Sequence, residues 1–234
     1  MTSPSKPSPT WDAAKQARWQ ANQQAQQLPL VLHLVLDGSG SMTPYAGSLR
    51  QAYNLYLRFL QRAASPLALL DTRCFGTLLQ SRTDGPPRHS WHDMLLPTAD
   101  VVPLGRAQEL TPETYAPLWG GTALYDALGT VCTTAVEAGH HLLIVFTDGA
   151  DTCSMTWTPE ALAEVLTIQQ ANAGWLCVFL GAFPEALGVA QALGFQPGNC
   201  LTFPNEQIPA AFEALRVATQ QYLQAAPSER RLLA

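Results

Sequence analysis

Two nearly unbroken apolar runs mark the centre of the predicted fold. Residues 30–36 read LVLHLVL, and residues 141–147 read HLLIVFT. Apolar runs of this length are typical of strands that are buried on both faces of a sheet. Shorter runs predict further strands at 67–75, 175–180 and 200–203, with a possible edge strand at 77–80.

Segments in which apolar residues have helical spacing lie between these strands. Within 45–63, apolar residues recur every three or four positions, and further helices are expected at 123–138, 184–193 and 207–225. Thr158 and Pro159 open another helix, as N-cap and first residue. Strands that alternate with helices predict an α/β fold, a Rossmann-like, doubly wound and mostly parallel sheet with helices on both faces.

The segments outside this alternation divide the chain. Residues 1–27 are interpreted as an N-terminal extension, with a Pro/Ser-rich start that is expected to be disordered and an Ala/Gln-rich part of helical composition. Residues 28–226 form the predicted domain, and 227–234 a C-terminal tail. Residues 81–105 are rich in Pro, Asp and Gly and predict a long, irregular excursion.

Composition narrows the classes of function. Hydrophobic residues make up 47% of the chain, and the net charge is −5 without a Lys/Arg run, so nucleic acid is not an expected partner. No stretch reads as a membrane-spanning helix or a secretory leader, so we expect a cytoplasmic protein without a membrane partner. The five cysteines are widely spaced and form no CxxC pair; Cys74 and Cys177 lie in apolar runs and are predicted core thiols.

Three loops carry the candidate chemistry. The first contains Asp37, Ser39 and Ser41 and directly follows the strand at 30–36. The second places Thr122 after two glycines, which allow the loop a close approach, and the third places Asp148 directly after the strand at 141–147. The first and third loops lie at strand carboxyl ends, where ligands bind in folds of this class.

These side chains supply hard oxygen donors. Two carboxylates and three hydroxyls suit Mg²⁺, with Mn²⁺ or Ca²⁺ as alternatives. Each loop alone is better explained by an ordinary structural role, such as a helix N-cap at Ser41 or Thr43 or a turn at Asp148. The combination of all three, in this strand context, favours one metal site.

The pattern Asp-x-Ser-x-Ser, Gly-Gly-Thr and Thr-Asp-Gly resembles the metal-ion-dependent adhesion site of von Willebrand factor A-type (VWA) domains. The resemblance implies a VWA fold, direct metal contacts from Ser39, Ser41 and Thr122, and contacts from Asp37 and Asp148 that often pass through water. It also implies an open position for an acidic residue of a protein partner. Residues 110–115, 121–127, 174–175 and 179–182 are similar to small bacterial intracellular VWA proteins.

The expected function is therefore a metal-dependent protein-interaction module and not an enzyme. The alternative is a metal-dependent hydrolase or phosphatase that uses the same site. No His, Lys or Arg lies in the three loops to act as a base, and His33 is predicted to be a satisfied core residue. Asp126 is expected to serve the helix dipole rather than to support the metal ligands, and Asp151 to lie on the rim of the site, where it either tunes the affinity for the cation or is simply solvated.

Overall fold

A six-stranded sheet forms the centre of the computed structural model, which describes residues 28–76, 101–117, 120–135, 139–171 and 174–225. The strand order is β3-β2-β1-β4-β5-β6. Their bounds are β1 Leu30–Asp37, β2 Leu69–Phe75, β3 Val102–Pro103, β4 His140–Thr147, β5 Trp175–Gly181 and β6 Cys200–Thr202. All neighbouring pairs are parallel except β2 and β3. The strand order reverses between β1 and β4, so the expected doubly wound sheet is confirmed.

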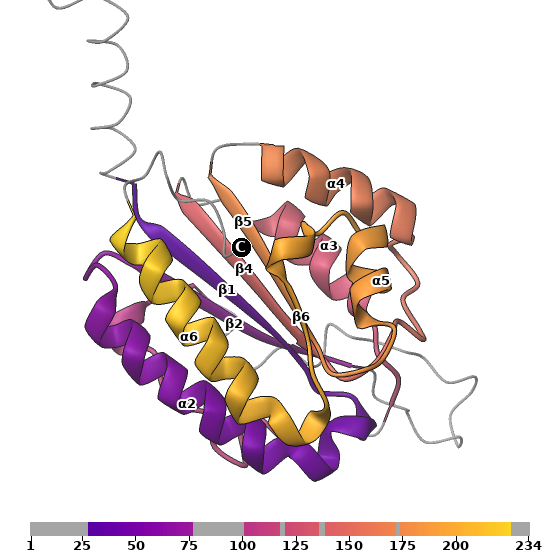
Figure 1. The fold of residues 1–234 in the computed structure, drawn as a ribbon, viewed down its shortest axis with the longest axis horizontal. Helices are drawn as coiled ribbons and strands as arrows, with labels where there is room; N and C mark the ends of the chain where they lie inside the picture. The colour runs from indigo at the N-terminus through magenta and orange to yellow at the C-terminus, as the bar shows by residue number, and fades with distance from the viewer. Residues whose placement is uncertain (1–27, 77–100, 118–119, 136–138, 172–173, 226–234) are drawn as a thin grey trace, which may run out of the picture.

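Helices cover both faces of this sheet (Figure 1). On one face lie α2 (Ala46–Ala63) and α6 (Ile208–Gln224), and on the other α3 (Leu124–Thr134), α4 (Pro159–Ala171) and α5 (Ala186–Ala192). Alternate residues of β1 enter the two cores: Leu32, Leu34 and Leu36 pack under α2 and α6, and Val35 under α3 to α5. Full burial of β1 and β4 explains why their sequences read as continuous apolar runs.

Short elements depart from the predicted pattern. Residues Gly40–Tyr45 form a 3₁₀ helix, η1, which contains Pro44 and precedes α2. The stretch 81–105 was expected to lack regular structure, but Val102–Pro103 pairs antiparallel with β2, and Leu104 is buried at the start of the 3₁₀ helix η3 (Leu104–Arg106). Two further 3₁₀ helices, η4 (Pro197–Asn199) and η5 (Asn205–Gln207), flank β6.

Thr158 caps α4 as predicted, because its Oγ1 accepts a hydrogen bond from the Ala161 amide at 3.2 Å. The expected edge strand at 77–80, the extension 1–27, the tail 227–234 and the part of the excursion before 101 lie outside the described residues. Among the residues that are described, no helix is long and apolar enough to cross a membrane.

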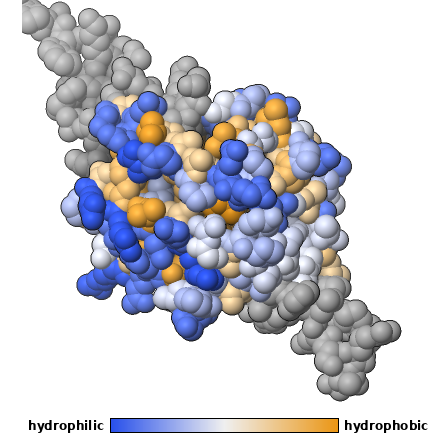
Figure 2. Space-filling view, turned by 60° about the horizontal axis from the view of Figure 1, so that its bottom comes forward, coloured by the Kyte–Doolittle hydropathy of each residue, from blue (hydrophilic) through white to orange (hydrophobic). Residues whose placement is uncertain are grey.

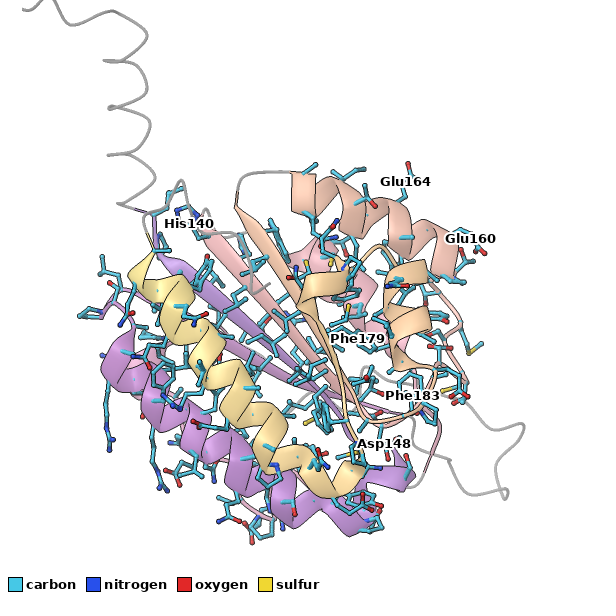
Figure 3. All side chains as sticks on the ribbon, viewed as in Figure 1. His140, Asp148, Glu160, Glu164, Phe179 and Phe183 are labelled. Atoms are coloured by element: carbon cyan, nitrogen blue, oxygen red, sulfur yellow. The ribbon has the colours of Figure 1, made fainter. Side chains whose placement is uncertain are left out.

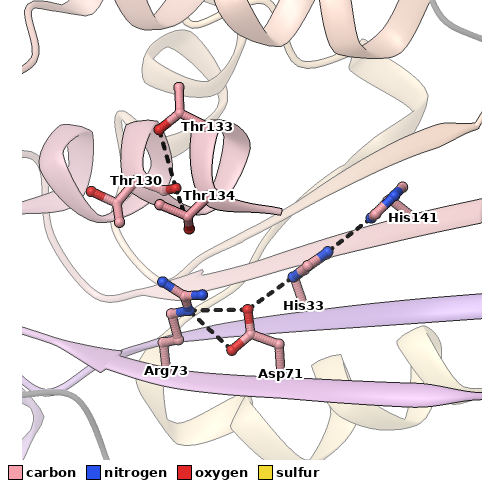
Figure 4. A network of polar contacts seen from close by, with 7 residues as sticks. All are labelled: His33, Asp71, Arg73, Thr130, Thr133, Thr134 and His141. Carbon is pink, nitrogen blue, oxygen red and sulfur yellow. Dashed lines mark hydrogen bonds and ion pairs between the residues drawn. The ribbon is translucent and has the colours of Figure 1, made fainter. Parts of the chain in front are cut away.

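A polar network crosses the sheet beneath α3 (Figure 4). His33 Nδ1 lies 3.0 Å from Asp71 Oδ2, and His33 Nε2 lies 3.0 Å from His141 Nδ1. Arg73 Nε donates to both carboxylate oxygens of Asp71 at 3.0 Å, and Trp175 stacks on His141 with ring centroids 4.4 Å apart. His33 and Asp71 are buried, so His33 is the satisfied core residue that the sequence predicted. Cys74 and Cys177 are likewise buried free thiols, as expected.

Asp71→Asn is expected to lower the free energy of unfolding by about 3 kcal/mol at pH 7, because it breaks a buried ion pair. Burial alone would raise the pKa of Asp71, but the hydrogen bonds and charges of His33 and Arg73 hold that pKa below its usual value. A lowered pKa in the folded state means that this stabilisation is complete above the unfolded-state pKa and is lost as the pH falls through the folded-state value. Urea unfolding at a series of pH values should therefore show the two proteins converging in acid.

The exposed ion pair of Arg58 and Glu109 provides the control for this measurement. Glu109→Gln should change the free energy of unfolding far less at pH 7, because solvent screens this exposed pair. An equal loss for Asp71→Asn at neutral and strongly acid pH would show that the carboxylate charge does not stabilise the network.

Candidate metal centre

Asp37 ends β1 and is fully buried. Its Oδ1 accepts a hydrogen bond from the Ser39 amide at 2.8 Å, and its Oδ2 accepts one from the Thr147 hydroxyl at 2.6 Å. Burial nevertheless raises the pKa of Asp37 to about 6. Ionisation of the Asp37 carboxyl group is therefore costly, and a neighbouring cation would stabilise its charged form.

Ser39, Ser41 and Asp148 form a continuous hydrogen-bonded chain between the loops after β1 and β4. Ser39 Oγ lies 2.9 Å from Ser41 Oγ, and Ser41 Oγ donates to Asp148 Oδ1 at 2.8 Å. Asp148 is half-buried, and this burial raises its pKa. Ser41 is exposed, so the chain runs from the buried end of β1 to the surface.

Thr122 joins the same edge of the sheet through backbone contacts. The Gly40 amide donates to the Gly120 carbonyl at 3.4 Å, which ties the loop of Thr122 to the loop after β1. The Thr122 Oγ1 lies 3.7 Å from the position that a Cβ on Gly149 would occupy. The structure therefore brings all five predicted residues to one end of the sheet.

Thr152 holds Thr122 in this position. The Thr122 amide donates to Thr152 Oγ1 at 2.8 Å, and the Thr152 amide donates back to the Thr122 carbonyl at 2.9 Å. A Cβ on Gly121 would lie 2.7 Å from Thr152 Oγ1 and 2.8 Å from Cys153 Sγ. Glycine at 121 is thus required for this close approach, as the sequence indicated.

Asp126 has a task in addition to the one expected. It lies in the first turn of α3, but its buried carboxylate accepts hydrogen bonds from the amides of Met155, Thr156 and Trp157 at 2.8–2.9 Å. Asp126 therefore fixes the loop before α4, in addition to the favourable place for a carboxylate in the first turn of α3 that the sequence predicted.

Asp151 holds the same loop through hydrogen bonds and is not simply a solvated rim residue. Its carboxylate accepts hydrogen bonds from the Tyr125 amide at 3.1 Å and from the Ser154 amide at 3.1 Å, and also from the Ser154 hydroxyl. Together with Asp126, it anchors the segment that carries Thr152 to the start of α3.

Two neighbours of the site carried no recognisable signal in the sequence. Tyr115 donates its hydroxyl to the Asp37 carbonyl, and the side chain of Asn205 hydrogen-bonds to Asp148. Both lie far along the chain from their partners, and neither belongs to a motif. Thr147, by contrast, directly precedes Asp148, and its hydroxyl is placed against Asp37 by the parallel register of β1 and β4.

The donor set is compatible with a small, hard divalent cation. It consists of two carboxylates and three neutral hydroxyls, all oxygen, which suits Mg²⁺ better than a metal that prefers sulfur or nitrogen. The described residues contain no cluster of three or more His, Cys, Asp and Glu side chains that could hold a metal in another way. Any ion at this edge would therefore depend on the serine and threonine hydroxyls.

Comparisons with known proteins give likenesses of fold. No protein-family model matches the chain, and neither does any curated protein. The pilus adhesin SpaC from Lactobacillus rhamnosus GG is 14% identical with a TM-score of 0.58, over 81% of this chain and 30% of SpaC. Proximal thread matrix protein 1 from the mussel byssus is 14% identical with a TM-score of 0.51, over 80% of this chain and 45% of that protein.

A von Willebrand factor type A protein from Catenulispora acidiphila is 19% identical, with a TM-score of 0.47. It is matched over 82% of this chain and 43% of its own length. The chain spans less than half of each of these three proteins. Fold and geometry together define an α/β domain with a cluster of oxygen donors at the switch point of its sheet.

Proposed function

We propose that the chain is a VWA-type binding module that holds one divalent cation and uses it to bind an acidic group of a protein partner. Mg²⁺ is the proposed ion, with Mn²⁺ and Ca²⁺ as alternatives, and its ligands are Asp37, Ser39, Ser41, Thr122 and Asp148. The observation that carries this proposal is the hydrogen-bonded chain from Ser39 through Ser41 to Asp148, beside the buried Asp37.

The charge of the site favours an anionic ligand. Two carboxylates balance the charge of a divalent ion, while the three hydroxyls are neutral and leave the ion able to attract a further anionic oxygen. Ser41 is exposed and Asp148 half-buried, so such an oxygen has access from solvent. One of the fold neighbours is named a pilus adhesin, which agrees with a binding role.

A metal-dependent hydrolase or phosphatase is the alternative for the same site. Hydrolysis requires a base or a cationic group beside the metal-bound water. The hydrogen bonds described for Asp37, Ser39, Ser41, Thr122 and Asp148 come from backbone amides, hydroxyls and the Asn205 side chain, not from His, Lys or Arg. We therefore favour binding, and turnover of simple phosphoesters with Mg²⁺ or Mn²⁺ would favour the enzyme.

Calorimetry is expected to show one Mg²⁺ or Mn²⁺ ion bound per chain. An ion that binds only the folded state stabilises it by about 2.7 kcal/mol at a free concentration of 100 times Kd, so the unfolding temperature should rise with the metal concentration. Ser39→Ala combined with Ser41→Ala should abolish both effects. Absence of heat and of any shift in unfolding temperature at millimolar metal would refute the site.

We also propose a cytoplasmic location. Cys74, Cys132, Cys177 and Cys200 are free thiols in the structure, and a reducing compartment keeps thiols in this state. Cell fractionation that finds the protein with a cytoplasmic marker would support this location, and recovery in another fraction would contradict it.

A further inference from the structure

A groove opens beside the candidate metal centre at the carboxyl ends of β5 and β6. Its volume is about 490 Å³, which is within the range of small-ligand sites. Its walls are mainly rings from three segments: Tyr45 at the end of η1, Phe183 and Pro184 after β5, and Phe203 and Pro204 after β6. We call it the β5–β6 groove.

The β5–β6 groove shares its segments with the candidate metal centre. The Ala182 amide donates to the Thr147 carbonyl at 2.9 Å, so the chain after β5 lies against the residue before Asp148. Phe183 and Asp148 lie at the same end of the sheet in Figure 3. Tyr45 closes η1, the 3₁₀ helix that also carries Ser41. An acidic residue bound at the metal would therefore place its neighbours in the ligand chain near this groove.

Asn205 connects the two places chemically. It lines the groove, and its side chain is close enough to Asp148 to lower the pKa of that carboxyl group. The Asn205 Oδ1 is the one buried side-chain nitrogen or oxygen without a hydrogen-bond partner among the described residues. A donor from a bound peptide could satisfy it after a small movement of the side chain.

We propose that the β5–β6 groove is a second recognition site for the partner, which receives a bulky apolar side chain close to the metal-bound acidic residue. This inference rests on the proposed function. Aromatic and proline walls lose little conformational freedom when they are covered. Glu206 on the exposed rim of the groove disfavours a second acidic side chain there, so the groove selects an apolar one.

The groove walls offer carbon surface to an apolar ligand group. On the face shown in Figure 2, hydrophilic and hydrophobic residues are interspersed, so hydropathy alone does not single out the groove. Its five rings, from two phenylalanines, two prolines and one tyrosine, give a bulky apolar side chain a surface to pack against. An extended peptide advances about 3.4 Å per residue, so the acidic and apolar residues should stand a few positions apart in the ligand, at a fixed spacing.

A random linear peptide library displayed on phage provides the test, with selection on the full chain in Mg²⁺ and in EDTA. Peptides that depend on Mg²⁺ should share one acidic residue and one bulky apolar residue at a fixed spacing. Pro184→Glu places a charge on an exposed wall of the groove and should reduce the enrichment of the apolar residue at least tenfold, while the acidic residue is retained.

Leu67→Glu is the matched control, because Leu67 is 68% exposed and precedes β2 at the opposite end of the sheet. It should leave both preferences unchanged. Peptides that require an acidic residue but show no apolar preference would overturn the groove and leave the metal site standing. Apolar peptides selected equally in EDTA and Mg²⁺ would show that the groove does not act with the metal. Absence of any Mg²⁺-dependent peptide would overturn both.

Discussion

Asp37→Asn is expected to abolish metal binding and, in EDTA at pH 7, to make the folded protein more stable. Burial holds the pKa of Asp37 at about 6, so the folded metal-free protein must ionise a carboxyl group that resists ionisation. A tenfold change in an ionisation constant corresponds to about 1.4 kcal/mol, which gives an expected gain of about 1–3 kcal/mol for the neutral amide. Asparagine keeps an acceptor for the Ser39 amide, and the Thr147 hydroxyl can turn to accept from its NH₂ group.

The sign of the pH dependence separates this effect from a packing effect. A carboxyl group whose pKa is raised in the folded state destabilises that state above the unfolded-state pKa. As the pH falls from 7 to about 5, Asp37 takes up its proton, and the wild-type protein should approach the variant in stability. Denaturant unfolding in EDTA at both pH values measures this directly.

Two further variants test whether the charge of Asp37 causes the change in stability. Asp148→Asn should also lose the metal, with a smaller change in stability because Asp148 is only half-buried. Asp37→Ala should be less stable than Asp37→Asn, because the Ser39 amide then loses its acceptor. If Asp37→Asn unfolds more easily than the wild type at both pH values in EDTA, the carboxylate is a structural group and the cation argument fails.

The strands and most helices were predictable because their burial imposes a period on the sequence. β1 and β4 are covered on both faces, and both read as apolar runs with boundaries correct to one residue. β3 was missed because it has two residues, one of them a proline, and depends on pairing with β2 rather than on its own pattern. The 3₁₀ helix before α2 was likewise not resolved, although Pro44 lies inside it.

The positions of the candidate site residues were predictable where a sequence motif directly follows a predicted strand. Asp37 and Asp148 lie at the carboxyl ends of adjacent parallel strands, and this topology alone brings both carboxylates to one edge of the sheet. The groups that hold these residues in place were not predictable. Asp126 binds the amides of Met155, Thr156 and Trp157, and a carboxylate in the first turn of a helix gives no indication of such distant partners. The sequence therefore identifies the oxygen-bearing residues of the candidate site better than the residues that hold them in place.

Capture of a protein partner is expected to be lost in EDTA and regained with Mg²⁺. Without the ion, two carboxylates at the site repel an incoming acidic residue, and with the ion they balance its charge and leave it attractive to one more anionic oxygen. Binding should therefore switch on with the metal and not merely strengthen. The immobilised full chain, mixed with cell lysate in the two conditions and followed by mass spectrometry, provides the comparison.

The variants decide whether the metal itself holds the partner. Ser39→Ala with Ser41→Ala removes two proposed ligands and should give the EDTA result even in Mg²⁺. Ser48→Ala with Ser65→Ala, at two exposed serines outside the site, should capture as the wild type does. A captured partner should then lose binding when one acidic residue is changed to its amide, by at least about 2 kcal/mol, or roughly thirtyfold in Kd. If the same proteins are captured in EDTA, or by the Ser39 and Ser41 double variant, the binding surface lies elsewhere on the domain.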